Sequence, residues 1–171
     1  MLDVLKEKGL DVISVGKIYD IFAGKGLTEG TRTANNDEGM AKTLELADRD
    51  FEGLCFVNLV DFDMTYGHRN DAPGYAAAAT AFDRQLGELL SRLREDDLLF
   101  ITGDHGCDPS TPSTDHSREY VPLLIYGSRV KAGVNLGTRS SFADLSAAVL
   151  EYFGETPVCE KSGSFLGAIL R

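Results

Sequence analysis

The sequence predicts an α/β fold in which a mainly parallel sheet is flanked by helices, giving three layers. Residues 54–60 and 98–102 are short apolar runs bounded by polar or glycine-containing segments, a pattern typical of buried strands. Between them, residues 74–96 repeat apolar side chains at helical spacing and include a run of alanines, which favours one long amphipathic helix. A strand, a helix and a strand within about 50 residues form a β-α-β crossover, which requires parallel strands and a right-handed connection.

The same alternation begins upstream of this unit. Residues 12–15 form a short apolar run that predicts a strand, and the charged residues before it predict a short helix. Residues 36–48 predict a further helix, with Met40, Leu44 and Leu46 as its apolar positions. The first part of the chain therefore contributes another strand and another helix to the same arrangement.

The alternation also continues downstream. Residues 121–126 predict a strand, and Pro122 indicates an end or an edge because proline donates no hydrogen bond to a ladder. A shorter strand is expected at residues 134–136. Two helices then follow, one capped by Ser141 and a short one over residues 165–170.

The composition is that of an ordinary folded chain. Its 171 residues are 43% hydrophobic and 26% charged, so we expect a single domain over residues 1–171. The net charge of −10 comes from 27 acidic against 17 basic residues, and the basic residues are scattered, which argues against binding to nucleic acid. Because this field repels anions, an anionic substrate would need local cations, either Lys and Arg side chains or bound metals.

The same reading gives expectations for location and for the cysteines. The first residues mix charges of both signs without a signal-peptide core, and no apolar stretch reaches the length of about 18 residues that a membrane span needs. We therefore expect a cytoplasmic protein with no membrane partner. Cys55, Cys107 and Cys159 are odd in number and lack C-x-x-C spacing, which favours free thiols over disulfides or a thiolate zinc site.

Acidic and histidine side chains follow the two most clearly defined strands, at the point where each strand ends. Asp63 and His68 come after the first, Asp104 and His105 come after the second, and His116 lies eleven residues further on. These are all three histidines of the chain. Ligand sites of open parallel sheets gather at the carboxyl ends of the strands, so we expect these five side chains to lie together.

Carboxylate oxygen and imidazole nitrogen together suit zinc, manganese or iron, whereas calcium prefers oxygen ligands alone. Two such ions about 3.5–4 Å apart clamp the attacking and leaving oxygens of a phosphoryl group, so the cluster predicts two-metal phosphoryl transfer. One His or Asp in a loop is usually only a solvated residue or a cap, and the prediction depends on all five together. Cys107 and Asp108 are given no role. Asp61 is open to two interpretations, a partner of a ligating histidine or a cap of its own loop.

Several strings of the sequence resemble those of phosphopentomutases. Two follow the first strand, VDFDM at 60–64 and YGHRND at 66–71, and TGDHGCDP lies at 102–109. VGKIYDIF at 15–22 and TDHSRE at 114–119 extend the resemblance over nearly the whole chain. The aspartate-histidine-glycine strand end alone marks the wider alkaline phosphatase superfamily, and the glycine-lysine-isoleucine and tyrosine-glycine-histidine-arginine strings narrow it to this family.

The resemblance implies an alkaline-phosphatase-like core and an isomerase that interconverts ribose or deoxyribose 1-phosphate and the 5-phosphate, a step of nucleoside and deoxyribonucleotide catabolism. It implies two manganese ions and a phosphorylated threonine. Asp63, His68 and His116 would hold one ion. Asp104 and His105 would hold the other, which in the family is completed by an aspartate near the amino terminus of the whole enzyme.

The resemblance also implies a role for Lys17, which matches the family lysine that approaches the phosphate of the pentose phosphate substrate. A compact ammonium group suits that role. The competing interpretation is a solvated lysine after a strand.

No residue matches the family's threonine nucleophile or its first metal-ligand aspartate. The resemblance therefore implies the carboxy-terminal portion of the catalytic core, lacking its amino-terminal strand and helix portion and its cap domain. We assign no nucleophile in this chain, and we expect it to be inactive alone, with the missing amino-terminal half of the enzyme as a partner. The alternatives are a metallophosphohydrolase, an enzyme like the cofactor-independent phosphoglycerate mutases, or a non-catalytic domain from a split reading frame.

Overall fold

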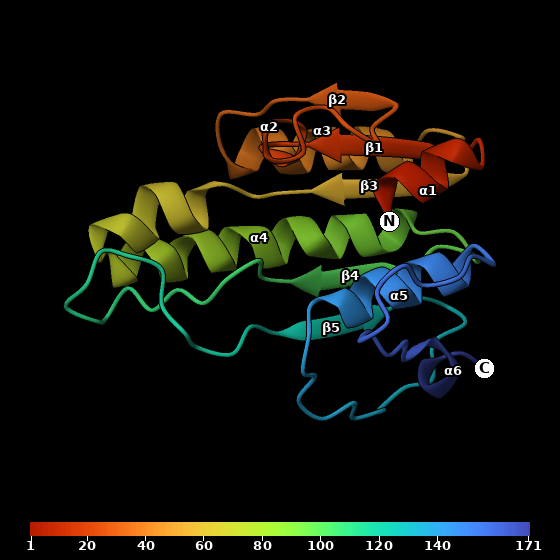
Figure 1. Ribbon diagram of the computed structural model, residues 1–171. Coiled ribbons are helices and arrows are strands. Elements are labelled where there is room, and N and C mark those ends of the chain that lie inside the picture. Colours follow the sequence, from red (N-terminus) through yellow and green to blue (C-terminus); the bar gives the residue numbers. More distant parts are fainter.

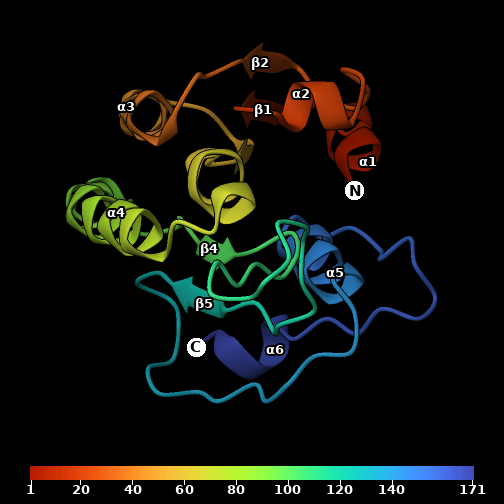
Figure 2. The same cartoon turned by 90° about the vertical axis from the view of Figure 1, so that its left-hand side faces the viewer.

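The computed structural model describes residues 1–171 and has the expected α/β architecture (Figure 1). The elements in chain order are α1 (Leu2–Glu7), β1 (Asp11–Val15), α2 (Ile18–Ile21), β2 (Glu29–Thr31), α3 (Asn36–Ala47), β3 (Gly53–Val57), the π-helical turn η1 (Phe62–Tyr66), the 3-10 turn η2 (Gly67–Arg69), α4 (Ala72–Arg92), β4 (Leu99–Thr102), β5 (Leu123–Tyr126), α5 (Ala143–Tyr152) and α6 (Leu166–Ile169). Seen end-on, α3 and α4 lie on one side of the strands and α1, α2 and α5 on the other, which gives the expected three layers (Figure 2).

The strands form two sheets. One has the order β2-β1-β3 with both pairs parallel, and the other pairs β4 with β5 antiparallel. β3 and β4 point the same way in Figure 1, as expected for a crossover through α4, but they belong to different sheets. The predicted β-α-β unit therefore connects two sheets and does not lie within one. β4 and β5 are antiparallel, because the segment between them contains no helix that would carry the chain back to the other end of the sheet.

The core lies on both faces of β1. Val12 packs in one cluster with Leu5 of α1 and Leu150 of α5, whereas Ile13 packs in another with Leu46 of α3. Successive residues of a strand point to opposite faces, so this alternation fixes which helix covers which face. Each of these side chains is at most 1% exposed, and full burial of one such side chain contributes roughly 1.5–3 kcal/mol.

Each of the two long helices, α3 and α4, begins directly after a residue whose side chain caps it. The side chain of Asn35 accepts a hydrogen bond from the backbone N–H of Glu38, and the side chain of Asp71 accepts one from Gly74 N–H. α3 spans the range predicted for it to within a residue. α4 ends earlier than predicted, at Arg92, because the backbone N–H of Arg94 donates to the Asp97 carboxylate and a turn replaces the last helical residues.

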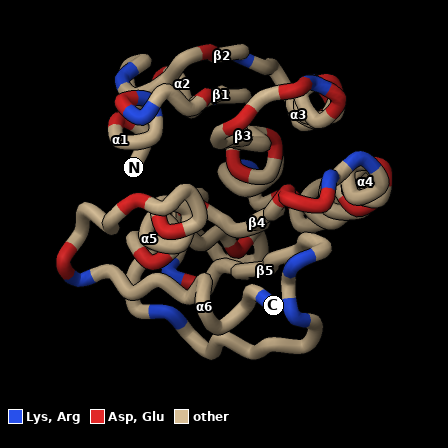
Figure 3. The backbone as a smooth tube through the Cα atoms, turned by 90° about the vertical axis from the view of Figure 1, so that its right-hand side faces the viewer, with Lys and Arg blue, Asp and Glu red and all other residues tan.

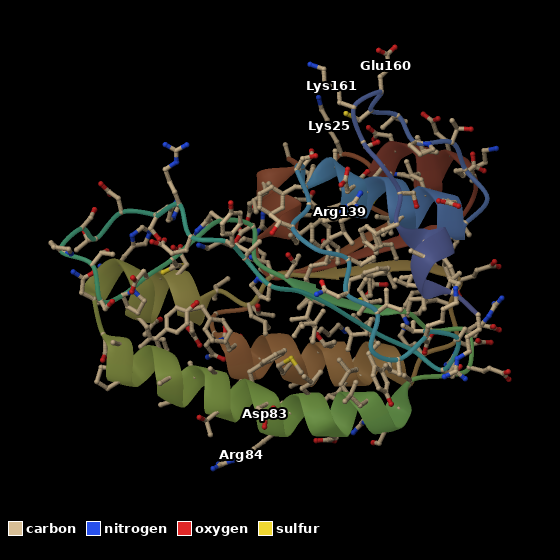
Figure 4. The ribbon with its side chains drawn as sticks, turned by 90° about the horizontal axis from the view of Figure 1, so that it is seen from below. Lys25, Asp83, Arg84, Arg139, Glu160 and Lys161 are labelled. Carbon is tan, nitrogen blue, oxygen red and sulfur yellow. The ribbon has the colours of Figure 1, made fainter.

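The outer face of α4 is charged. Asp83 and Arg84 point away from the strands and into solvent (Figure 4). Over the whole chain, Lys and Arg are scattered along the backbone and do not gather on one element (Figure 3). No helix combines the length and apolar character that crossing a membrane requires.

The carboxy-terminal predictions are partly confirmed. β5 follows Pro122 directly and is an edge strand, as that proline predicts. The strand predicted at residues 134–136 is wrong. Gly133 and Gly137 flank it with φ of 73° and 62°, and the side chain of Asn135 accepts a hydrogen bond from Gly137 N–H, so the backbone turns there.

The last two helices are both present. α5 begins two residues after Ser141, whose hydroxyl accepts a hydrogen bond from the backbone N–H of Ala143. α6 lies within the predicted range 165–170. Four elements were not predicted: β2 and α2 are very short, and the turns η1 and η2 have no sequence pattern of their own.

Candidate metal centre

Asp63 and His68 sit on two unusual turns that follow β3. Asp63 lies in the π-helical turn η1 and His68 in the 3-10 turn η2. Single π-helical turns are rare and occur frequently at functional sites. Both turns lie beyond the carboxyl end of β3, at the left in Figure 1, where the loop after β4 also lies.

Asp61 anchors these turns to the start of α3. Its carboxylate accepts hydrogen bonds from the backbone N–H of Asn36 at 2.7 Å and from the hydroxyl of Thr65 at 3.0 Å. In return, the backbone N–H of Asp61 donates to the side chain of Asn36 at 2.9 Å. Of the two interpretations of Asp61, the structure therefore supports the loop cap.

His105 and His116 are brought together by a closed loop after β4. Gly106 and Ser117 form an isolated antiparallel bridge, in which the backbone N–H of Ser117 donates to the Gly106 carbonyl at 3.0 Å. Only glycine fits at 106, because a Cβ there would lie 2.7 Å from the backbone nitrogen of Glu119. The imidazole rings of His105 and His116 stack with 3.6 Å between their centroids.

Three imidazoles converge on one carboxylate oxygen. Asp63 Oδ1 lies 3.1 Å from Nε2 of His116, 3.2 Å from Nε2 of His68 and 3.8 Å from Nε2 of His105. Asp104 Oδ1 is 3.6 Å from Nε2 of His105. All five residues selected from the sequence therefore lie in one cluster, and ligand atoms of Asp63, His68 and His116 are within 4.8 Å of one another.

Backbone carbonyls fix the protons of two of these histidines. Nδ1 of His68 lies 2.5 Å from the Thr114 carbonyl oxygen, and Nδ1 of His105 lies 3.0 Å from the Gly106 carbonyl oxygen. A carbonyl only accepts, so each Nδ1 must carry the proton and donate it. In the neutral ring, Nε2 then presents its lone pair toward Asp63, which is the state in which histidine binds metal.

The environment of Asp63 fits a bound cation. Its Oδ1 atom is buried and accepts no hydrogen bond. A buried carboxylate oxygen without a hydrogen bond, facing imidazole lone pairs, is strongly unfavourable. A divalent cation satisfies the carboxylate and the lone pairs together, and this mixture of oxygen and nitrogen donors suits zinc, manganese or iron.

Asp104 is the most exposed of the five residues of the cluster. The Asp104 side chain is 64% exposed, against 23% for Asp63. Both Asp104 and His105 line a cavity of about 1050 Å³ that extends along β5 toward α5 and includes Arg118. A second ion held by these two residues would face this cavity.

The thiol next to the cluster is not activated. Burial and the negative charges of Asp63 and Asp108 raise the pKa of Cys107, so the thiol stays protonated at neutral pH. Its Sγ lies against Gly67, where a Cβ would be only 2.6 Å away. The three cysteines are free, as expected, and Cys107 has a packing contact under the turn that carries His68.

Lys17 lies beyond the carboxyl end of β1, the central strand of the β2-β1-β3 sheet. It directly follows β1 and Gly16, whose φ of 81° and whose close approach to the Asn58 carbonyl, 2.3 Å from an added Cβ, exclude other residues. Lys17 takes part in none of the contacts within the cluster, and its role toward a phosphate stays a prediction.

The pattern of side chains in the sequence could not predict the backbone contacts that orient the histidines of the cluster. The carbonyls of Thr114 and Gly106, and the bridge at Gly106, are backbone groups that any sequence possesses. The one signal present was Gly106 itself, since a glycine directly after a ligand often marks a close backbone approach.

Comparison with known proteins agrees with the donor set. Residues 8–157 match the family described as the Metalloenzyme superfamily. A curated phosphopentomutase of Lachnoclostridium phytofermentans is 62% identical over 153 residues, which are 90% of this chain and 39% of that protein. One of Carboxydothermus hydrogenoformans is 61% identical over 92% of this chain and 40% of its own length, and one of Acetivibrio thermocellus is 59% identical over 99% and 44%.

A solved structure shares the fold. The phosphoglycerate mutase of Leishmania mexicana, solved at low cobalt concentration, aligns with a TM-score of 0.71 and 16% identity over 96% of this chain and 38% of that one. The chain spans 39–44% of the length of the three curated relatives named above. With a family match over most of its residues and a cluster of metal-ligand side chains at the strand ends, the chain belongs to the metalloenzyme superfamily and is similar in sequence to the phosphopentomutases.

Proposed function

We propose that this chain is part of a phosphopentomutase, an isomerase that interconverts ribose or deoxyribose 1-phosphate and the 5-phosphate. The observation that carries the proposal is the convergence of three imidazole Nε2 atoms on the unpaired Oδ1 of Asp63. It occurs in a chain that is 53–62% identical to the curated phosphopentomutases it matches. A site for metal ions and a sequence similar to one enzyme family point to the same chemistry.

The proposed cofactors are two divalent ions, with Mn²⁺ as the metal. Asp63, His68 and His116 would hold the first ion, and Asp104 and His105 would contribute to the second. When bound, the two ions neutralise the phosphoryl oxygens and stabilise the charge that develops on them. The chain's own part is to hold the ligands, because the carbonyls at 106 and 114 keep two rings in the metal-binding tautomer.

Lys17 is the proposed contact for the phosphate of the pentose phosphate. It stands at the carboxyl end of β1, where ligands of open α/β sheets bind, and its ammonium group would offset the net charge of −10 locally. No residue of this chain is assigned as the nucleophile. We propose that residues 1–171 form one domain, the carboxy-terminal portion of the catalytic core of a cytoplasmic enzyme.

Two other functions fit the observations less well. A metallophosphohydrolase or a cofactor-independent phosphoglycerate mutase would use similar ligands, but the likeness to a phosphoglycerate mutase is at 16% identity and concerns the fold. A non-catalytic domain from a split reading frame would have no need for an unpaired carboxylate among three imidazoles. The sequence similarity favours pentose phosphate as the substrate.

The function is tested in a full-length chimera. The matched 153 residues of the Lachnoclostridium phytofermentans phosphopentomutase are replaced by the corresponding part of this chain, and turnover of ribose 1-phosphate to ribose 5-phosphate is measured with Mn²⁺. We expect turnover, and loss of turnover in the Asp63→Asn chimera. Turnover of phosphoglycerate without turnover of pentose phosphate would overturn the proposal.

The metal assignment is tested on the chain itself by calorimetric titration with Mn²⁺. The three-ligand set of Asp63, His68 and His116 should give one moderate site, and the incomplete pair Asp104 and His105 a weaker one. Two equally tight sites would contradict the unequal ligand sets, and absence of binding would contradict the metal centre.

A further inference from the structure

One arginine beside the metal cluster has no acidic partner in the chain. Arg118 is exposed, and its guanidinium makes no ion pair and no side-chain hydrogen bond. Four other arginines, Arg92, Arg94, Arg129 and Arg139, each form an ion pair with an aspartate. The guanidinium of Arg118 is therefore free to bind an anion from outside the chain, although the net charge is −10.

The backbone holds Arg118 close to His105. Ser117 forms the antiparallel bridge with Gly106, and its N–H donates to the Gly106 carbonyl at 3.0 Å. Arg118 directly follows this bridge, and Gly106 directly follows His105. Arg118, Asp104 and His105 accordingly line one cavity, of about 1050 Å³.

The chemistry of a guanidinium at this position suits a phosphate group. Its planar fork can donate two parallel hydrogen bonds to phosphate oxygens, and it stays charged at every physiological pH. Asp104 and His105 are the residues proposed to contribute to the second ion. Because the acidic chain as a whole repels anions, Arg118 and that ion together would supply the local positive charge that a phosphate needs.

The other arginines near the cluster or the cavity are placed differently. Arg69 adjoins the cluster, but its guanidinium donates to the carbonyl of the preceding residue at 3.4 Å, and it does not line the cavity. Arg139 lines the cavity and is paired with Asp144. Arg171 also lines it, but this residue ends the chain, and the carboxy terminus lies at the opposite end of the strands from the turns that follow β3 (Figure 1).

We propose that Arg118 is a phosphate-binding residue of this site, and that its guanidinium holds the phosphate group of the substrate beside Asp104 and His105. This rests on the proposed function, because it takes a pentose phosphate as the substrate. Lys17 follows β1 of the β2-β1-β3 sheet, whereas Arg118 belongs to the segment between β4 and β5. Each of the two sheets would therefore contribute one cation to the binding of the substrate.

The proposal is tested by calorimetric titration of the chain with inorganic phosphate in the presence of Mn²⁺. Arg118→Gln should weaken phosphate binding at least about tenfold, because it removes charge-assisted hydrogen bonds. Arg118→Lys should give an intermediate affinity, since lysine keeps the charge but lacks the planar fork. Arg84→Gln is the matched control and should bind phosphate like the wild type, because Arg84 is also exposed and unpaired but points away from the strands (Figure 4).

Titration of the same variants with Mn²⁺ separates this role from a structural one. A cation beside the cluster repels a metal ion, so Arg118→Gln should leave the affinity for Mn²⁺ unchanged or raise it. An arginine that only supported the fold of the loop would have the opposite effect, because its replacement would lower the affinity for Mn²⁺ together with the Tm.

Three outcomes would overturn the proposal. The first is an equal affinity for phosphate in Arg118→Gln and Arg84→Gln. The second is the absence of phosphate binding by the wild type with Mn²⁺, and the third is a loss of Mn²⁺ affinity in Arg118→Gln that accounts for its weaker phosphate binding. The readout uses neither pentose phosphate nor turnover. The proposed function fails separately if the chimera converts phosphoglycerate but no pentose phosphate, an outcome in which inorganic phosphate would still bind through Arg118.

Discussion

Replacing Asp63 by asparagine should separate the stability of the fold from the stability conferred by metal. Without metal, Asp63 Oδ1 is buried, accepts no hydrogen bond and faces three Nε2 atoms at 3.1–3.8 Å. An asparagine removes the buried charge, and its amide donates to an imidazole lone pair. We expect the metal-free Asp63→Asn chain to be as stable as the wild type or more stable, by up to about 1 kcal/mol.

The stabilisation by added metal, in contrast, should be smaller in Asp63→Asn than in the wild type. At a free Mn²⁺ concentration of about 100 times the Kd, linkage stabilises the wild type by about 2.7 kcal/mol. For a chain of this length, that raises the Tm by about 5–11 °C. Loss of even a group that only supports a ligand weakens metal binding by about 10–100-fold, and the only carboxylate of the three-residue set should matter at least as much. At a hundredfold weaker affinity the gain falls to about 0.4 kcal/mol, a shift of under about 2 °C.

The assay is thermal unfolding followed by circular dichroism, with and without Mn²⁺, on the wild type, Asp63→Asn and Asp115→Asn. Asp115 is a matched control, because it is exposed, adjoins His116 and does not belong to the ligand set. The control should keep the full metal-dependent shift. Equal shifts in Asp63→Asn and Asp115→Asn would refute the assignment of Asp63 as a ligand.

Three further predictions concern other parts of the chain. His116→Ala should lower the bound metal but change the metal-free stability by less than about 0.5 kcal/mol, because this side chain is half exposed; emission spectrometry and urea unfolding measure the two. Asp144→Asn should cost about 1.5–3 kcal/mol at pH 7 in urea unfolding. Hydrogen bonds from Gly163 N–H and Arg139 lower the pKa of Asp144 in the fold, so the unfolded chain binds more protons as the pH falls and the wild type loses stability. The destabilisation of Asp144→Asn relative to the wild type should therefore shrink below about pH 4. Burial raises the pKa of Cys55 to about 11, so at pH 8 it should react with a thiol reagent at least about 100-fold more slowly than exposed Cys159, and equal rates would contradict its burial.

The periodic elements and the clustering of the candidate ligand residues were predictable from the sequence. α3 and α4 each combine helical spacing with an asparagine or aspartate cap, and β1 and β3 are short apolar runs, so local pattern and local structure agree. The candidate metal cluster followed from residue type and position, since all three histidines and the two aspartates Asp63 and Asp104 follow strand ends. These are local signals, which can be recognised in the sequence because they do not depend on contacts between distant residues.

The remaining features depend on contacts between distant residues or on backbone groups. The crossover between residues 54–60 and 98–102 predicted parallel strands, and the chain direction agrees, but pairing is a long-range property and the two strands belong to different sheets. The strand expected at 134–136 was wrong because the glycines on either side impose a turn that three apolar or amide residues cannot override. The π-helical turn that contains Asp63 is anchored by hydrogen bonds between Asp61 and Asn36, which lie 25 positions apart in the sequence.

The metal cluster is built from segments that follow strands of different sheets. Asp63 and His68 follow β3, and His105 and His116 follow β4. Apart from the ligands, contacts between these segments include the bond from His68 Nδ1 to the Thr114 carbonyl and that from the Asn70 side chain to the Thr111 carbonyl at 3.1 Å.

Because β3 and β4 are not hydrogen-bonded to each other, an ion bound at this cluster would cross-link the two sheets at their carboxyl ends. Such a cross-link opposes separation of the two halves, so the stabilisation by metal should appear chiefly at this interface.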